Sequence, residues 1–150
     1  MSQLSLSIES SLLVRDVTGE YRPANADEVL QAAQRLLGAQ LRGREVLTSP
    51  QAVRDFLRVK LGALEHEVFA VLMLDAQNRL IEYVELFRGT VSQASVYPRE
   101  VVKESLAFNA AAAIFCHNHP SGVAEPSRAD EALTSTLKTA LSLVDVRVLD

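Results

Sequence analysis

The sequence predicts an α/β domain in which a mixed β-sheet is flanked by helices. Segments of strand length at residues 68–74, 80–87 and 111–117 are interspersed with amphipathic segments of helical length. The first two strand segments are separated by a short turn and form a hairpin. The order hairpin, helix, strand, helix, strand then implies a mixed sheet with helices packed against it.

Residues 1–24 show no strong hydrophobic periodicity, and the first predicted element is a helix that follows them. Asn25 followed by Glu28 resembles a capping box, and apolar residues recur at helical spacing beyond it. Gly38 and Gly43 are expected to weaken and end this helix, because glycine disfavours helix interiors.

A second helix and a hairpin come next. Ser49-Pro50 predicts a helix start and Gly62 its end. The continuous apolar run 68–74 predicts a buried strand. Residues 75–78 form a turn, and 80–87 is the returning strand.

The remaining elements alternate between helix and strand. Helical spacing of apolar residues predicts a helix over 98–112, starting with Pro98. The small, apolar run 111–115 predicts a buried strand that ends at His117. Residues 127–143 are predicted to be a helix with Ser127 as its N-cap, and 144–149 a final strand.

Two histidines and an aspartate gather at the end of the predicted strand. Side chains alternate along a strand, so His117 and His119 point the same way if the extended conformation lasts to His119. The turn-forming run 120–122 and the N-cap Ser127 then bring Asp130 back towards the strand end. Two imidazoles and a carboxylate suit zinc and leave a fourth position for water, so we expect a metallohydrolase centre.

Other interpretations of these residues use no metal. Ser127-x-x-Asp130 is also a capping box, in which Asp130 only bonds the N-cap backbone. Cys116 beside His117 suggests a Cys–His dyad, but alternation places the two side chains on opposite faces; we expect Cys116 to be a small buried hydrophobe. A zinc deaminase is excluded, because its signature needs His-x-Glu and two further cysteines, whereas this chain has one cysteine.

Composition limits the remaining classes. A chain of 150 residues with 48% hydrophobic content predicts one domain with a sizeable core. The single cysteine excludes an internal disulfide and fits a cytoplasmic protein, and neither a signal peptide nor a membrane span is expected. The net charge of −4, without a basic stripe, argues against DNA binding.

A resemblance adds to this interpretation. His117, His119, Ser127 and Asp130 match the His-x-His-x7-Ser-x2-Asp signature of JAMM (MPN-type) zinc metalloproteases, which have a cytidine-deaminase-like architecture. The flanking run 117–122, His-Asn-His-Pro-Ser-Gly, resembles the RadC branch (UPF0758). The short N-terminal part resembles that of its short, prophage-type form. The resemblance implies one Zn²⁺ per chain, held by His117, His119 and Asp130, and hydrolysis of a peptide or isopeptide bond.

The resemblance also implies two catalytic residues. The RadC-type pattern Glu-x-Phe-x-x-Leu-x-Leu-Asp falls on residues 67–75, which makes Glu67 the candidate acid/base; Glu65 is its competitor. Ser127 would donate a hydrogen bond to the oxyanion. Asn118 and Ser121 are candidates for orienting the loop or contacting substrate.

The resemblance divides the chain into an N-terminal helical extension, 1–45, and a RadC-like domain, 46–150, which we expect to be truncated at its C-terminus. Two other functions remain open. One is a DNA repair or recombination accessory role, suggested by the historical label of the RadC family. The other is a catalytically silent interaction module, since a fold alone does not fix function. The oligomeric state stays open.

Overall fold

A four-stranded mixed sheet forms the centre of the computed structural model, which describes residues 12–62, 64–89, 95–120 and 127–149. Its strands, in spatial order, are β4 (Leu80–Arg88), β3 (Val68–Leu74), β5 (Ala112–His117) and β6 (Arg147–Leu149). β3 runs antiparallel to both β4 and β5, whereas β6 runs parallel to β5. The predicted fold class is confirmed.

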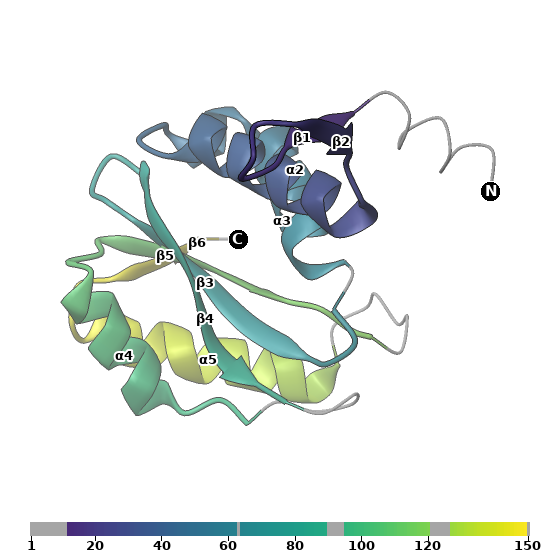
Figure 1. Cartoon of the computed structure of the whole chain (residues 1–150). Coiled ribbons are helices and arrows are strands. Elements are labelled where there is room, and N and C mark those ends of the chain that lie inside the picture. Colours follow the sequence, from purple (N-terminus) through teal and green to yellow (C-terminus); the bar gives the residue numbers. More distant parts are fainter. Residues whose placement is uncertain (1–11, 63, 90–94, 121–126, 150) are drawn as a thin grey trace.

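Helices cover both faces of this sheet (Figure 1). On one face lie α2 (Ala26–Leu41) and α3 (Pro50–Leu61), and on the other lie α4 (Pro98–Ala107) and α5 (Arg128–Ser142). All seven residues of β3 are buried. Phe69, Val71 and Met73 join the core beneath α4 and α5, whereas Leu72 and Leu74 join the core beneath α2 and α3. A strand buried on both sides explains why 68–74 is continuously apolar.

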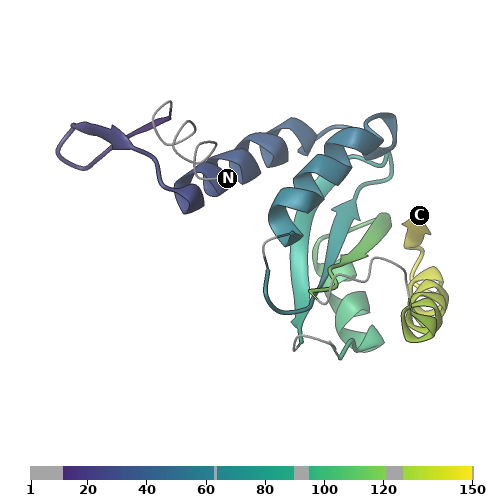
Figure 2. The same cartoon turned by 90° about the vertical axis from the view of Figure 1, so that its right-hand side faces the viewer.

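A short hairpin precedes the helices and was not predicted. β1 (Leu13–Arg15) pairs with β2 (Tyr21–Pro23), and Figure 2 shows the pair at the end of α2 that lies far from the sheet. Asp16 stabilises the turn, because its Oδ1 accepts hydrogen bonds from the backbone N–H groups of Thr18 at 2.9 Å and Glu20 at 3.0 Å. Strands of three residues are too short to produce a detectable period.

The capping box of α2 is confirmed, but the predicted role of Gly38 is wrong. Glu28 N–H donates to Asn25 Oδ1 at 2.9 Å, and Asn25 N–H donates to Glu28 Oε1 at 3.2 Å. The helix continues through Gly38 to Leu41. A Cβ at position 38 would lie 3.3 Å from Cε2 of Phe56, so glycine permits the close approach of α3 rather than ending α2. Between the two helices lies the 3₁₀ turn η1 (Val46–Thr48).

The predicted helix over 98–112 is too long. α4 ends at Ala107, because Asn109 adopts a left-handed conformation with φ of 52°. Asn109 N–H donates to the carbonyl of Leu106 at 3.0 Å, and Ala110 N–H donates to that of Ser105 at 2.9 Å. These are the two bonds of a Schellman motif, which satisfies the last carbonyls of a helix and redirects the chain. β5 can therefore begin at Ala112.

The end of α5 repeats this arrangement and shortens the final strand. Asp145 has φ of 59°, and Val146 N–H donates to the carbonyl of Leu141 at 3.0 Å. The chain becomes extended only at Arg147, so the predicted strand over 144–149 is three residues long. Among the described residues, no helix combines the length and the apolar character needed to cross a membrane.

Candidate metal centre

The end of β5 places His117 on the face covered by α4 and α5. His117 is paired with Phe69 on β3, whereas the preceding residue, Cys116, points to the opposite face. β5 stops at His117, yet the ring of His119 still meets that of His117, with centroids 4.6 Å apart and planes at 72°. The prediction that the two imidazoles meet is therefore confirmed, although the strand does not extend to His119.

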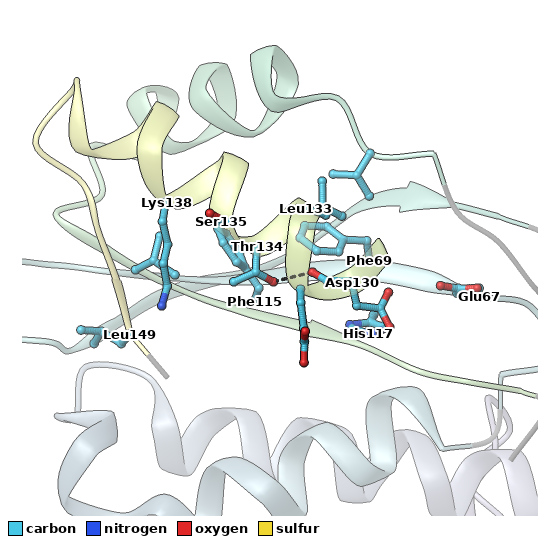
Figure 3. Close-up of a pocket in the computed structure, with 13 residues that line it drawn as sticks. Glu67, Phe69, Phe115, His117, Asp130, Leu133, Thr134, Ser135, Lys138 and Leu149 are labelled. Atoms are coloured by element: carbon cyan, nitrogen blue, oxygen red, sulfur yellow. Dashed lines mark hydrogen bonds and ion pairs between the residues drawn. The ribbon is translucent and has the colours of Figure 1, made fainter. Parts of the chain in front are cut away.

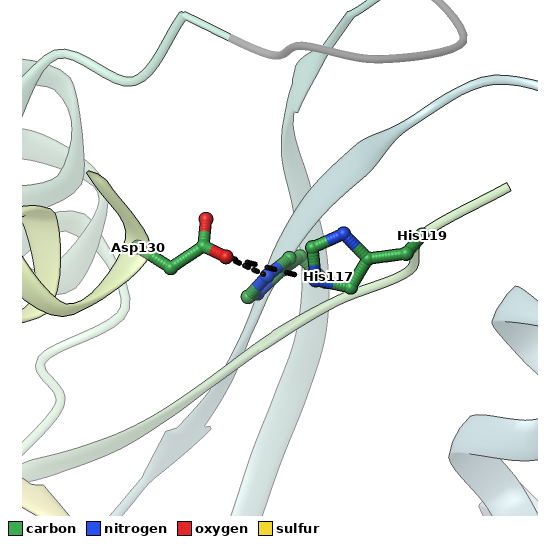
Figure 4. A group of neighbouring side chains, drawn as sticks. All are labelled: His117, His119 and Asp130. Carbon is green, nitrogen blue, oxygen red and sulfur yellow. Dashed lines mark ion pairs between the residues drawn. The ribbon is translucent and has the colours of Figure 1, made fainter. Parts of the chain in front are cut away.

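Asp130 reaches the histidines from the first turn of α5. Ser127 is the N-cap, and the predicted capping box is present: Asp130 N–H donates to Ser127 Oγ at 3.1 Å, and Ser127 N–H donates to Asp130 Oδ2 at 2.7 Å. The same Oδ2 lies 3.4 Å from Nε2 of His117 and 3.7 Å from Nε2 of His119 (Figure 4). Capping and proximity to the histidines occur together.

The geometry of these three side chains fits a metal ion. One ligand atom from each of His117, His119 and Asp130 lies within 4.8 Å of the others. Tetrahedral ligands at about 2.0–2.1 Å from zinc lie about 3.3 Å from each other, close to the two nitrogen-to-oxygen distances here. Nε2 of His117 is buried and has no hydrogen-bond partner among the described residues. The cluster could therefore hold a metal ion.

Local interactions favour the charged form of Asp130. Burial opposes ionisation, but the hydrogen bonds from Ser127 and the proximity of His117 outweigh it and hold the pKa of Asp130 below its ordinary value. The carboxylate side chain is 19% exposed. An ionised, half-buried carboxylate is the form that a divalent cation requires.

Cys116 takes no part in this cluster. Its Sγ donates to the carbonyl of Ala70 at 3.4 Å, and its side chain packs against the core that contains Leu61 and Val68. The residue as a whole is half-buried, but desolvation of the thiol, together with the charge of Glu85, raises the pKa of Cys116 to about 12. The expected apolar packing is present, but Cys116 is half-buried rather than fully buried.

A pocket of about 530 Å³ begins at the cluster and extends beneath α5. Figure 3 shows Glu67, His117 and Asp130 at one end and Leu149 at the other. Much of its lining is apolar: Phe69, Val96, Phe115, Leu133, Val148 and Leu149. Among the described residues that line it, neither His119 nor Ser127 is included.

Glu67 and Glu65 occupy different environments. Glu67 immediately precedes β3, is 9% exposed and lines the pocket, whereas Glu65 is exposed. The backbone carbonyl of Glu67 accepts a hydrogen bond from Gly89 N–H at 2.8 Å. Of the two candidates, Glu67 is the one among the described residues that lines the pocket.

The side chain of Asn118, whose role the sequence left open, makes two hydrogen bonds to the backbone. Its Oδ1 accepts from Val68 N–H at 2.7 Å, and its Nδ2 donates to the carbonyl of His66 at 2.9 Å. It therefore orients the loop, one of the two roles expected of it. Ser121 lies outside the described residues.

Comparison with known protein families identifies the family of this chain. Residues 47–150 match the family model of the RadC-like JAB domain. The chain belongs to this family.

RadC-like relatives are similar over most of the chain. The UPF0758 protein of Leptothrix cholodnii is 65% identical over 132 residues, which are 88% of this chain and 60% of the relative. The UPF0758 protein of Variovorax paradoxus is 52% identical over 147 residues, which are 98% of this chain and 65% of the relative. The chain thus spans about 60% of the length of the curated relatives it matches. The resemblance to the RadC branch is confirmed.

Proposed function

We propose that this RadC-like JAB domain is a zinc-dependent hydrolase that cleaves a peptide or isopeptide bond. The observation that carries the proposal is the convergence of His117, His119 and Asp130 beside a pocket whose lining includes His117 and Asp130. Two nitrogens and one oxygen form a ligand set that catalytic zinc sites commonly use.

In this proposal His117, His119 and Asp130 hold the ion. Zinc, when bound, supplies a Lewis acid that makes water available as a nucleophile near pH 7. The hydrogen bond from Ser127 N–H to Oδ2 of Asp130 fixes the carboxylate, so the third ligand needs little reorganisation on binding.

Glu67 is assigned the proton transfer. Glu67 lines the same end of the pocket as His117 (Figure 3) and is largely shielded from solvent. A carboxylate positioned in this way can accept a proton from the attacking water and deliver it to the leaving amine. The apolar walls beyond it suit the side chains of a peptide substrate.

Ser127 is assigned to the oxyanion. Its Oγ accepts the bond from Asp130 N–H, and its one hydroxyl hydrogen can be donated either to the Asp130 carboxylate or to a substrate oxygen. The hydroxyl can therefore cap α5 and donate to the oxygen of the cleaved carbonyl at the same time.

Zinc content and amide hydrolysis, measured on the same protein, test the proposal. A peptide mixture from a cell digest and a lysine-branched isopeptide serve as probes, with products identified by mass spectrometry. We expect about one zinc per chain and cleavage for the wild type. Glu67→Gln should keep the zinc and lose at least about 100-fold in rate, because it lacks the base.

Glu65→Gln is the matched control, since Glu65 is exposed two residues away; it should keep both zinc and activity. His117→Ala should lose both. Zinc uptake without cleavage of any probe would contradict the hydrolase and favour a silent interaction module or a DNA accessory role. Equal activity in Glu67→Gln would contradict the role of Glu67 alone.

A further inference from the structure

Two hydrogen bonds of Asn118 flank Glu67 on both sides along the chain. Oδ1 of Asn118 accepts from Val68 N–H at 2.7 Å, and Nδ2 donates to the carbonyl of His66 at 2.9 Å. We propose that Asn118 is a positioning residue that fixes Glu67 relative to the two histidines. The inference rests on the proposed function, in which Glu67 is the base.

The backbone pairing of the sheet ends just before Glu67. The last paired residues of β3 and β5 are Phe69 and His117, so no strand pairing with β5 holds the segment that carries Glu67. Asn118 replaces that pairing with its side chain, because a carboxamide offers the same acceptor and donor as a peptide group. It bonds the residues before and after Glu67, as one residue of a neighbouring parallel strand would through its own N–H and C=O.

The opposite edge of the same segment is also tied. Gly89 N–H, at the end of β4, donates to the carbonyl of Glu67 at 2.8 Å. Residues 66–68 are thus held from the β5 side by Asn118 and from the β4 side by Gly89. Since Glu67 is 9% exposed, a fixed backbone leaves its side chain little freedom.

The two hydrogen bonds from Asn118 to His66 and Val68 form a bridge between two parts of the candidate site. Asn118 lies between His117 and His119, so one residue joins the loop that carries both imidazoles to the segment that carries the carboxylate. A displacement of about 1 Å at a reacting group can cost about 100-fold in rate. Loss of the Asn118 bridge should therefore slow hydrolysis by about 10–100-fold without removing a metal ligand.

Co²⁺ added to the metal-free protein is the probe, because its visible absorption reports on the surroundings of the ion. We compare Asn118→Ala, Glu67→Ala and the double variant with the wild type. The pH midpoint of the Co²⁺ absorption change should move in Asn118→Ala in the same direction as in Glu67→Ala. The double variant should move no further than Glu67→Ala, because both changes act through one carboxylate.

Gln34→Ala is the matched control. Gln34 also uses its side-chain amide to bond a backbone carbonyl, that of Val59 at 3.3 Å, but it lies on α2 away from the cluster. It should behave as the wild type. In metal-free protein, Asn118→Ala should also speed the hydrogen exchange of the Val68 amide, which measures the lost bond independently of activity. Should Asn118→Ala fail to fold, Asn118→Ser removes the bridge and carries the same measurements.

The outcomes separate this proposal from the proposed function. If the pH midpoint of the Co²⁺ absorption change is that of the wild type in Asn118→Ala but is shifted in Glu67→Ala, only the role of Asn118 is overturned. Loss of Co²⁺ binding in Asn118→Ala also overturns it, since the residue would then organise the histidines instead. Absence of Co²⁺ uptake by the wild type, or an unchanged midpoint in Glu67→Ala, refutes the proposed chemistry and the positioning role with it.

Discussion

Ser127 and Asp130 exchange two hydrogen bonds at the start of α5, and the Asp130 oxygen that accepts one of them is also the oxygen that faces both histidines. The sequence offered capping and metal binding as alternative explanations for Ser-x-x-Asp. In the structure one carboxylate has the geometry for both. The bond from Ser127 N–H holds the Asp130 carboxylate in an orientation that faces both histidines.

This dual geometry predicts that the two roles can be separated by substitution. Asp130→Asn keeps an oxygen that can accept the Ser127 N–H, so the thermal stability of the metal-free protein should change little. Zinc affinity should fall by more than about 100-fold, because even changes outside the ligand shell cost about 10–100-fold. Asp130→Ala should lose zinc and also the bond from Ser127 N–H to the carboxylate, which should lower stability by about 0.5–1.5 kcal/mol. Zinc titration and thermal unfolding in chelator measure the two effects.

Equal zinc affinity in Asp130→Asn and the wild type would contradict the metal role. Equal metal-free stability in Asp130→Ala and the wild type would show that the bond from Ser127 N–H to the carboxylate contributes nothing measurable to stability.

The proposed metal site predicts that removal of zinc lowers the thermal stability of the folded chain. If only the folded chain brings the three ligands together, zinc at about 100 times its dissociation constant stabilises it by about 2.7 kcal/mol. For a chain of this size that corresponds to roughly 5–10 °C in Tm. Wild-type protein should lose this increment on addition of a chelator, and added zinc should restore it.

His117→Ala provides the comparison, since Nε2 of His117 is buried beside Asp130 and belongs to the cluster. Its Tm should be the same with and without chelator. If zinc raised the Tm of His117→Ala by as much as that of the wild type, the stabilising ion would have to bind elsewhere on the chain.

Sequence patterns predicted most of the fold because the central elements have strong signals. The apolar run 68–74 is buried on both faces, and Asn25 and Ser127 each form the cap expected of them. The errors lie where a single residue overrides the periodicity. Asn109 takes a left-handed conformation that ends α4, although apolar residues at helical spacing continue to Ala110. Asp145 takes one after α5, which delays the final strand until Arg147.

How much of the candidate site the sequence could predict differs from residue to residue. The spacing of His117 and His119 and the turn back to Asp130 predicted their meeting from local rules alone. The environment of Glu67 depends on pairing between β3 and β5, which no local pattern contains. The bonds of Asn118 span 50 and 52 residues, so only the folded chain reveals what this side chain does.

The environment of Cys116 predicts that its thiol reacts slowly with thiol reagents in the native protein. Burial and the charge of Glu85 raise the pKa of its thiol to about 12, and the reactive species is the thiolate. At pH 8 about one thiol in 10⁴ is then ionised, against about a quarter for a free cysteine with a pKa of about 8.5. Labelling of the native protein with a thiol reagent should be at least about 1,000-fold slower than labelling in denaturant.

The chain contains one cysteine, so the label reports on this site alone. Denatured protein should bind one equivalent rapidly. Fast labelling of the native protein would show that the face of the sheet beneath α3 opens readily.

Two leucines at the end of α5 predict a contrast in folding stability. Leu141 is fully buried in the core beneath α4 and α5, whereas Leu143, two residues further on, is 82% exposed. Leu141→Ala removes buried methyl groups and leaves a cavity, which should lower the free energy of unfolding by about 2–5 kcal/mol. Leu143→Ala removes the same atoms from solvent and should change it by less than about 0.5 kcal/mol. Denaturant unfolding of both variants measures the difference, and equal effects would mean that α5 does not pack on the sheet through Leu141.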